Sequence, residues 1–152
     1  MKAPLILVSS FALALGISAC AGPQKPATSA VTLGKPTVLF SVISGTAKPH
    51  NVTMALQLAN HALDAKRRVV LFFSVRGVQI PLQTLNSSLS FNAKPIKQLL
   101  ADLIAKGAEV QVCPHCLQAL KIDAKQLVKG AKVTTREMLL STLGPNTNVF
   151  TF

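Results

Sequence analysis

Two hydrophobic patterns alternate along the chain after residue 36. Continuous apolar runs rich in β-branched residues, which are typical of strands buried on both faces, occupy residues 36–44 and 67–75. Apolar residues recur at helical spacing within residues 51–66 and 94–107, which predicts two helices that each bury one face. The two patterns therefore predict strands and helices that follow one another in turn.

The same alternation continues to the C-terminus. Residues 76–94 carry turn-forming and polar side chains and have room for a short helix. Asn51 and Thr135 are expected N-caps, and Gly107 is an expected helix end. The remaining expected elements are strands at 108–113, 131–135 and 147–152, helices at 114–122 and 135–144, and one or two helical turns at 123–130.

Alternating strands and helices form parallel sheets that are covered on both faces. About five strands within residues 37–152 predict an α/β domain, a flavodoxin-like three-layer sandwich. In such sheets, ligands and reactive groups gather at the carboxyl ends of the strands, near the switch in strand order. The chemistry of this chain is therefore expected at that edge of the sheet.

The N-terminal residues indicate export. Lys2 is followed by an uncharged apolar run that is about as long as a secretory signal and ends in "ISAC" at Cys20. The ending resembles the lipobox of bacterial lipoproteins, which implies that residues 1–20 are a signal peptide and that Cys20 carries lipid. An ordinary signal peptide, cut near Ala19 or Ala21, is the alternative.

The segment at residues 21–36 is rich in Pro, Ala, Gly, Ser and Thr and reads as a flexible linker. The expected location is the bacterial cell envelope, lipid-anchored and facing the periplasm. The outer membrane is favoured because Ala21, which follows the lipid-bearing cysteine, is no acidic retention signal.

Charge changes the expected partner. The net charge is +11, but the basic residues are spread along the chain, and only "KRR" at 66–68 is clustered. An exported protein with scattered charge is not expected to bind nucleic acid, and anionic lipid headgroups are the simpler partner. A basic surface without a specific partner is the alternative.

Two of the three cysteines lie in "GAEVQVCPHCLQALKI", residues 107–122. Cys113 follows a predicted strand and begins a predicted helix, with Pro114 at a favourable first helical position. Helix N–H groups, the helix dipole and a protonated His115 would each favour a thiolate. We therefore expect Cys113 to be the nucleophile and Cys116, one turn further, to be its resolving thiol.

Other interpretations of the pair remain open. Neighbouring cysteines in an oxidising compartment commonly form a permanent disulfide. Zinc would need further ligands, and His115 is poorly placed between the cysteines, so copper(I) would suit the thiolates better. A thioredoxin-like oxidant is disfavoured because only residues 117–152 follow the motif. We expect no resident cofactor or metal.

The loop "SGTAKPHN", residues 44–51, is expected at the same sheet edge. Thr46, His50 and Asn51 could line a pocket there together with His115, and His50 could approach Cys113. A plain connecting loop is the alternative. The chain has no P-loop, no GxGxxG motif and no paired carboxylates among its five acidic residues, so the cysteines carry the expected chemistry.

Three stretches are similar to members of the DsrE/DsrF-like family. They are "VLFSVISGTAKPHNVTMALQLANHAL", "VVLFFSVRGVQI" and "IKQLLADLIAKGAEVQVCPHCLQALKI". The resemblance implies a small α/β fold assembled into trimers or hexamers. It also implies that Cys113 accepts sulfane sulfur as a persulfide from a donor and passes it to an acceptor protein. Cys116 and the lipoprotein leader depart from the single-cysteine cytoplasmic members. A non-catalytic oligomeric binding module is the alternative function.

Overall fold

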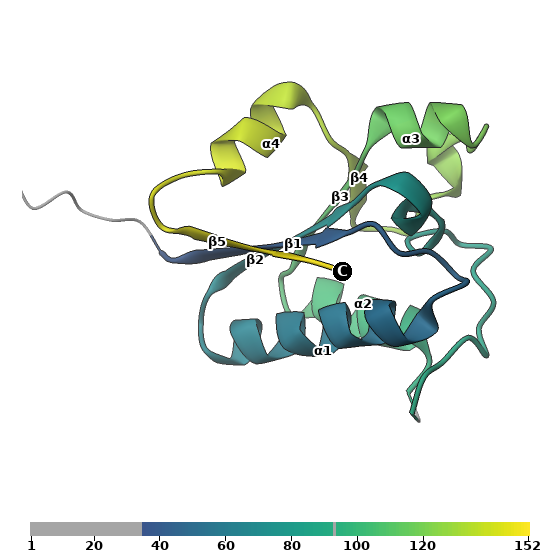
Figure 1. Cartoon of the computed structure of the whole chain (residues 1–152), viewed down its shortest axis with the longest axis horizontal. Helices are drawn as coiled ribbons and strands as arrows, with labels where there is room; N and C mark the ends of the chain where they lie inside the picture. Colours follow the sequence, from purple (N-terminus) through teal and green to yellow (C-terminus); the bar gives the residue numbers. More distant parts are fainter. Residues whose placement is uncertain (1–34, 93) are drawn as a thin grey trace, which may run out of the picture. The chain divides into compact units, whose positions relative to one another are not determined.

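The computed structural model describes residues 35–92 and 94–152 (Figure 1). The predicted signal peptide at 1–20, the lipidation site Cys20 and residues 21–34 of the predicted linker lie outside the described residues. In the part of the chain that is described, no helix is both long enough and apolar enough to cross a bilayer.

The described chain forms a five-stranded sheet in the order β4-β3-β2-β1-β5. Every neighbouring pair of strands is parallel, as the alternating pattern predicted. The strands are β1 (Thr37–Val42), β2 (Arg68–Phe73), β3 (Glu109–Val112), β4 (Ala131–Val133) and β5 (Thr147–Thr151).

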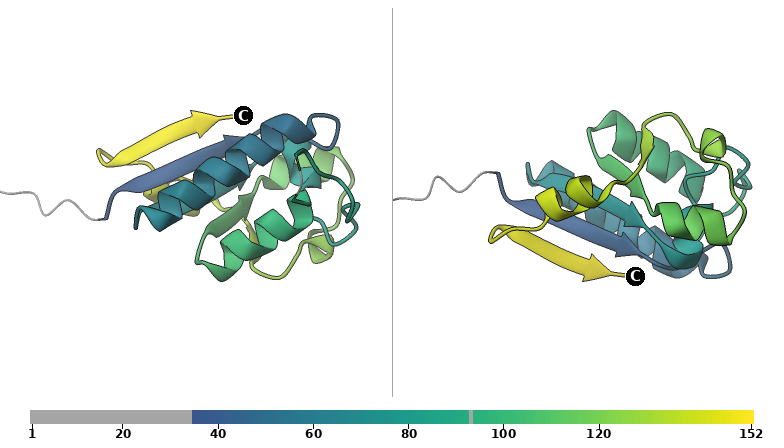
Figure 2. Two further views of the ribbon diagram at one scale, coloured as in Figure 1. Left: turned by 90° about the horizontal axis from the view of Figure 1, so that it is seen from below. Right: turned by 90° about the horizontal axis from the view of Figure 1, so that it is seen from above.

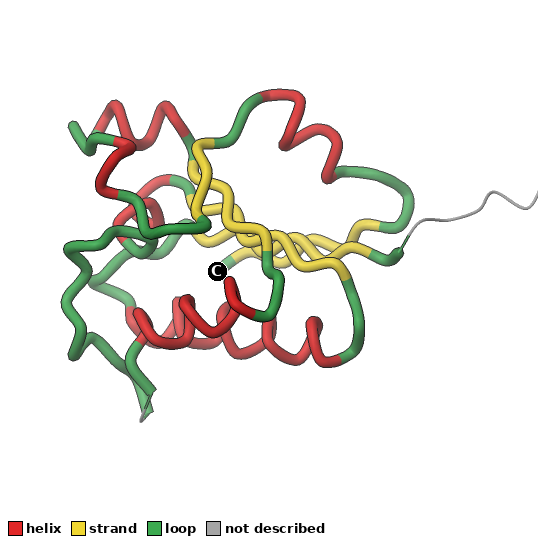
Figure 3. The backbone as a smooth tube through the Cα atoms, turned by 180° about the vertical axis from the view of Figure 1, so that it is seen from behind, coloured by secondary structure: helices red, strands yellow, loops and turns green. Residues whose placement is uncertain are grey.

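Helices cover both faces of the sheet (Figures 1 and 3). One face carries α1 (Pro49–Asp64) and α2 (Ile96–Ala105), and the other carries α3 (Pro114–Ala119) and α4 (Arg136–Thr142). The two views of Figure 2 show each helical layer in front of the sheet. This arrangement confirms the predicted three-layer parallel α/β class.

The strand order places the topological switch at β1. From β1 the chain adds β2, β3 and β4 on one side, and then crosses back through α4 to place β5 on the other side. Flavodoxin itself has the order 2-1-3-4-5, so this chain shares the architecture but not the strand order. The carboxyl end of β1 therefore lies beside the switch.

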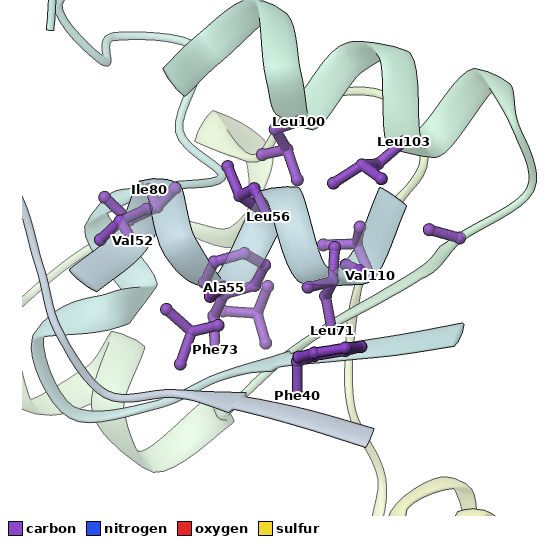
Figure 4. Close-up of a cluster of buried hydrophobic side chains, with 14 of the residues drawn as sticks. Phe40, Val52, Ala55, Leu56, Leu71, Phe73, Ile80, Leu100, Leu103 and Val110 are labelled. Atoms are coloured by element: carbon purple, nitrogen blue, oxygen red, sulfur yellow. The ribbon is translucent and has the colours of Figure 1, made fainter. Parts of the chain in front are cut away.

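The main core lies between the sheet and the α1–α2 layer (Figure 4). Alternate residues of β1 and β2, including Phe40 and Phe73, face Leu56 of α1 and are completely buried. Burial of each such side chain stabilises the fold by about 1.5–3 kcal/mol. Other buried members of this cluster are Val42, Val52, Ala55, Leu71, Ile80, Ile96, Leu100, Leu103, Val110 and Val112.

The opposite face is covered more thinly. Leu140 and Leu143, on and just after α4, are 54% and 48% exposed, and Val149 on β5 is 52% exposed. On the α1 side of the sheet, Phe150 of β5 stacks on Phe40 and is 45% exposed. The described chain thus leaves apolar side chains uncovered at its β5 edge.

Helix boundaries lie within three residues of the predicted ones. Lys48 occupies the N-cap and Pro49 the first turn, so the prediction of Asn51 as N-cap is wrong. Proline fixes the helical φ and lacks an N–H, which lets the helix begin two residues earlier. At α4 the prediction is confirmed, because the Thr135 hydroxyl accepts a hydrogen bond from the Met138 N–H at 3.2 Å.

The predicted helix end at Gly107 is also confirmed. Gly107 follows the last turn of α2 with φ of +96°, a conformation that favours glycine. Within the long segment after β2, the short helix is a 3₁₀ helix, η1 (Val75–Gln79), and a second one, η2 (Ala124–Gln126), precedes β4. Both 3₁₀ helices fall where the sequence predicted short helical pieces.

Candidate functional site

Cys113 lies at the junction of β3 and α3. Its backbone N–H donates to the Phe73 carbonyl at 2.9 Å, which continues the pairing of β3 with β2. Its φ and ψ of −65° and 119° are those of an extended N-cap residue, and Pro114 begins the helix. The half-buried thiol therefore lies at the carboxyl end of β3, where the fold class placed the expected chemistry.

Cys116 lies in the first turn of α3 and is held by η1. Its Sγ accepts a hydrogen bond from the Val75 N–H at 3.0 Å. Val75 has φ of +51°, and a β-branched side chain in the left-handed region is strained by about 1–3 kcal/mol. Strain of this kind concentrates at functional sites, and here it presents an N–H group to a thiol.

Both cysteines are free thiols, and they interact with each other. Burial raises the pKa of Cys116, and a hydrogen bond with Cys113 and repulsion by its thiolate raise that pKa further. The hydrogen bond from the Val75 N–H acts in the opposite direction. Cys116 therefore keeps its proton to a higher pH than an ordinary cysteine does.

The Cys113 side chain does not cap α3. This helix spans six residues, and the Cys113 side chain makes no capping hydrogen bond within the described residues. His115 is exposed on the first turn of the helix. The Cys113 thiol thus interacts with Cys116, while the Cys113 carbonyl accepts from the Leu117 N–H at 3.1 Å.

Two cavities of about 410 and 390 Å³ open at the same edge of the sheet. They share Thr46, Arg76 and Gln79 in their linings. The other lining residues of the first cavity are residues 43–48, which follow β1. The lining of the second cavity includes Leu120 and Ile122, which follow α3.

The four predicted pocket residues have different surroundings. Thr46 lines both cavities. His50 stacks on Phe91, with ring centroids 4.0 Å apart and planes 15° apart. The Asn51 side-chain amide donates to Ser44 Oγ at 3.2 Å, and His115 is exposed. The structure therefore brings Thr46, and none of the other three, into the cavity linings.

Sequence reasoning missed Val75, Arg76 and Gln79. All three belong to the 3₁₀ helix η1, which follows β2 directly at the carboxyl edge. Ligands of parallel sheets bind at the carboxyl ends of the strands, and this rule pointed to the loop after β1. The same rule would also have pointed to Arg76, because Arg76 follows the buried strand β2. Among residues 35–92 and 94–152, no three histidine, cysteine or acidic side chains come together as a possible metal site.

Residues 37–152 match the model of the DsrE/DsrF-like family. The chain belongs to the DsrE/DsrF-like family. The resemblance in its three sequence stretches is thereby confirmed. The matched range extends from the first residue of β1 to the C-terminus, so it contains every strand and helix described above.

Relatives of this DsrE-like domain include an uncharacterized protein, MJ0989, of Methanocaldococcus jannaschii. It is 33% identical over 98 residues, which cover 64% of this chain and 83% of the relative.

Two solved structures share the fold. The ychN protein of E. coli has a TM-score of 0.65 at 21% identity, covering 78% of this chain and 99% of its own. A protein of unknown function from Methanobacterium thermoautotrophicum, MTH1491, has a TM-score of 0.57 at 13% identity, covering 76% and 96%. At these identities the likeness concerns the fold alone.

Proposed function

We propose that the DsrE-like domain carries sulfane sulfur as a persulfide on Cys113, with Cys116 as its partner thiol. The observation that supports this is the thiol pair at the carboxyl end of β3. Both thiols are half-buried, and Cys116 is held in place by the Val75 N–H at 3.0 Å. Family membership adds to the proposal, because sulfur relay is common among DsrE-like proteins.

The sulfur transfer needs no cofactor and no external oxidant. The Cys113 thiolate attacks the outer sulfur of a donor persulfide, R–S–SH. A new S–S bond forms to Cys113 while the donor S–S bond breaks, and its electron pair leaves on the donor thiolate, R–S⁻. The product is Cys113–S–SH and R–S⁻. A thiolate of an acceptor protein takes the outer sulfur by the same displacement and restores Cys113.

The protonation state of Cys116 would decide how long the Cys113 persulfide lasts. When ionised, Cys116 attacks the inner sulfur of Cys113–S–SH, forms a Cys113–Cys116 disulfide and releases hydrosulfide. The raised pKa of Cys116 keeps the thiol protonated and therefore a poor nucleophile at neutral pH. The arrangement thus favours storage of the sulfur over its release.

Mass spectrometry of the chain treated with a small persulfide tests the proposal. We expect a gain of about 32 Da, one sulfur atom, on Cys113. The gain should disappear in Cys113→Ser and persist in Cys116→Ser. A chain that only loses about 2 Da would be a dithiol–disulfide redox protein, and a chain that reacts at neither thiol would be a binding module. Either outcome overturns the carrier proposal.

We also propose that the domain is anchored in the bacterial envelope by lipid on Cys20, in the outer membrane and facing the periplasm. The support is the order Lys2, apolar run and "ISAC" in the sequence. Expressed in bacteria, the wild-type chain should lose residues 1–19 and gain acyl mass at Cys20, and it should fractionate with membranes. Cys20→Ala should carry no acyl mass. A wild-type chain released into the periplasm without lipid would contradict the proposal.

Finally, we propose a homo-oligomer, a trimer or hexamer, formed through the β5 edge. Phe150 on β5 is 45% exposed, and Met54 and Leu58 on α1 are 44% and 37% exposed. Asn60 and Asp64 of α1 bond to Lys106 beyond α2, so Met54 and Leu58 lie by helical spacing on the flank turned away from α2. Exposed apolar side chains beside an open strand edge commonly mark an association surface.

A further inference from the structure

The cavities at the carboxyl edge carry positive charge that the protein does not neutralise. Arg76 lines both cavities, and Lys48 lines the first. The ion pairs formed within the described ranges are Arg68–Glu109, Lys94–Asp102 and Lys106–Asp64, and none involves Arg76 or Lys48.

The remaining acidic residues are also occupied elsewhere. The Asp123 carboxylate accepts from the Lys125 N–H at 2.9 Å at the start of η2. Glu137 lies in the first turn of α4, where backbone N–H and Thr135 lower the pKa of its carboxyl. None of the five acidic residues, all of which the structure describes, lines either cavity. An anion entering there would meet two cations and no carboxylate.

Close packing fixes the backbone of Arg76 at the cavities. The Gly77 N–H donates to the Ile43 carbonyl at 3.1 Å, which ties η1 to the end of β1. A Cβ at Gly77 would lie 2.0 Å from the Val42 carbonyl oxygen, and one at Gly45 would lie 2.7 Å from the Arg76 carbonyl oxygen. Only glycine at both positions permits this approach, so the wall that carries Arg76 is preorganised.

The same 3₁₀ helix links the cavities to the thiols. Val75 precedes Arg76 and donates its N–H to Cys116 Sγ at 3.0 Å. Leu120 and Ile122, which come directly after α3, line the second cavity. A ligand held at Arg76 would therefore contact the residue next to Val75, whose N–H bonds to Cys116.

We infer that these cavities bind the carboxylate end of a small anionic thiol persulfide, which delivers its outer sulfur to Cys113. The inference rests on the proposed carrier function and names the class of its donor. Cavities of this volume suit a small organic molecule, and guanidinium and ammonium groups are the usual partners of carboxylates. The apolar side chains of Leu82, Leu85 and Ile122 suit the carbon frame of such a donor.

Sulfur transfer from such a donor is a nucleophilic displacement at its outer sulfur. The Cys113 thiolate forms a bond to the outer sulfur of the donor, and the donor thiolate leaves with the electron pair. Arg76 and Lys48 hold the carboxylates and offset the negative charge that gathers when one anion approaches another. They act as positioning residues, because the reacting atoms are the sulfurs alone.

The test compares two donors that differ only in carboxylates, namely glutathione persulfide and the persulfide of glutathione diethyl ester. The rate of sulfur gain at Cys113 is followed by mass spectrometry in the full chain. We expect the wild type to react faster with the acid than with the diester. Arg76→Gln, and more so the double variant with Lys48→Gln, should slow the acid by about tenfold and leave the diester unchanged.

Arg67→Gln is the matched control. Arg67 is exposed at the amino end of β2, on the opposite edge of the sheet, and its guanidinium is in none of the ion pairs of the described residues. This variant loses the same charge and should react like the wild type with both donors. Equal slowing in Arg67→Gln and Arg76→Gln would assign the effect to net charge and overturn the inference.

A second measurement does not depend on sulfur transfer. Calorimetric titration of Cys113→Ser with S-methylglutathione, which cannot react, should show binding that Arg76→Gln weakens by about tenfold. If Cys113 gains sulfur from both donors equally and no binding is seen, the cavity inference fails while the carrier function stands. If S-methylglutathione binds but Cys113 never gains sulfur, the carrier function fails.

Discussion

Cys113 and Cys116 are three residues apart in the sequence, yet their surroundings differ. Cys113 follows β3 as the N-cap of α3, and its carbonyl accepts the first helical hydrogen bond, from the Leu117 N–H at 3.1 Å. Cys116 is inside the helix and receives the Val75 N–H at 3.0 Å. The strained backbone of Val75, with φ of +51°, is what brings that N–H to the sulfur. Burial and the interaction with Cys113 raise the pKa of Cys116, and Cys113 is the proposed nucleophile of the pair.

The raised pKa of Cys116 predicts how alkylation depends on pH. Because the thiolate is the reactive form, Cys116 should react with iodoacetamide only at a higher pH than an ordinary cysteine. In Cys113→Ser the repulsion by the Cys113 thiolate is removed, while the effect of burial remains. The pKa of Cys116 should then fall, and its alkylation should shift to lower pH. Peptide mapping over a pH series measures both profiles, and coincident Cys116 profiles in the two proteins would refute the assignment.

At the scale of elements, η1 connects the parts of the site. It packs on the end of β1 through Gly77, lines both cavities through Arg76 and Gln79, and contacts α3 through Val75. A 3₁₀ helix of five residues is too short to be stable alone, so its geometry depends on these contacts. The close approach to β1 is the contact that permits the others.

Gly77→Ala should therefore weaken the fold. The added Cβ would lie 2.0 Å from the Val42 carbonyl oxygen, so η1 must move away from β1, at a cost of about 3 kcal/mol. Urea unfolding followed by circular dichroism measures the loss. The control is Gly144→Ala, where no atom lies within 4 Å of the added Cβ, and its stability should stay within about 0.5 kcal/mol. Equal stabilities of the two variants would show that η1 can shift without cost.

At the scale of the whole molecule, the strand order leaves one edge of the sheet open. β5 pairs only with β1 within the described chain, and Val149 and Phe150 on its two faces are about half exposed. Phe150 also stacks on the core residue Phe40, with centroids 5.7 Å apart. An open edge with apolar faces is a liability unless it is covered, and a second copy of the chain is the proposed cover.

Met54→Glu tests the proposed oligomer without disturbing the core, because Met54 is 44% exposed on α1. Residues 21–152 should sediment as a trimer or hexamer in the wild type, and Met54→Glu should shift them to lower mass. Gln57→Glu places the same charge on an exposed position of the same helix, off the apolar flank, and should leave the mass unchanged. A wild-type monomer at micromolar concentration would contradict the proposal.

Local patterns in the sequence determine most of the architecture. The apolar runs at β1 and β2, the helical spacing in α1 and α2, and the caps at Gly107 and Thr135 each fix a short segment by interactions within a few residues. Because such signals are local, the sequence alone placed the strands and helices, the α/β class and Cys113 at a strand end. The prediction of Asn51 as N-cap was wrong because α1 begins earlier, at Pro49.

Only the tertiary structure decided what surrounds Cys113 and Cys116. The strand order, the Val75 N–H on Cys116, the stacking of His50 on Phe91 and the place of Arg76 in the cavities all join residues far apart in the chain. No local pattern specifies such contacts, because they depend on how η1, α1 and α3 meet at one edge of the sheet. The sequence by itself determined where the thiols lie in the fold, and long-range packing decided that the pKa of Cys116 is raised.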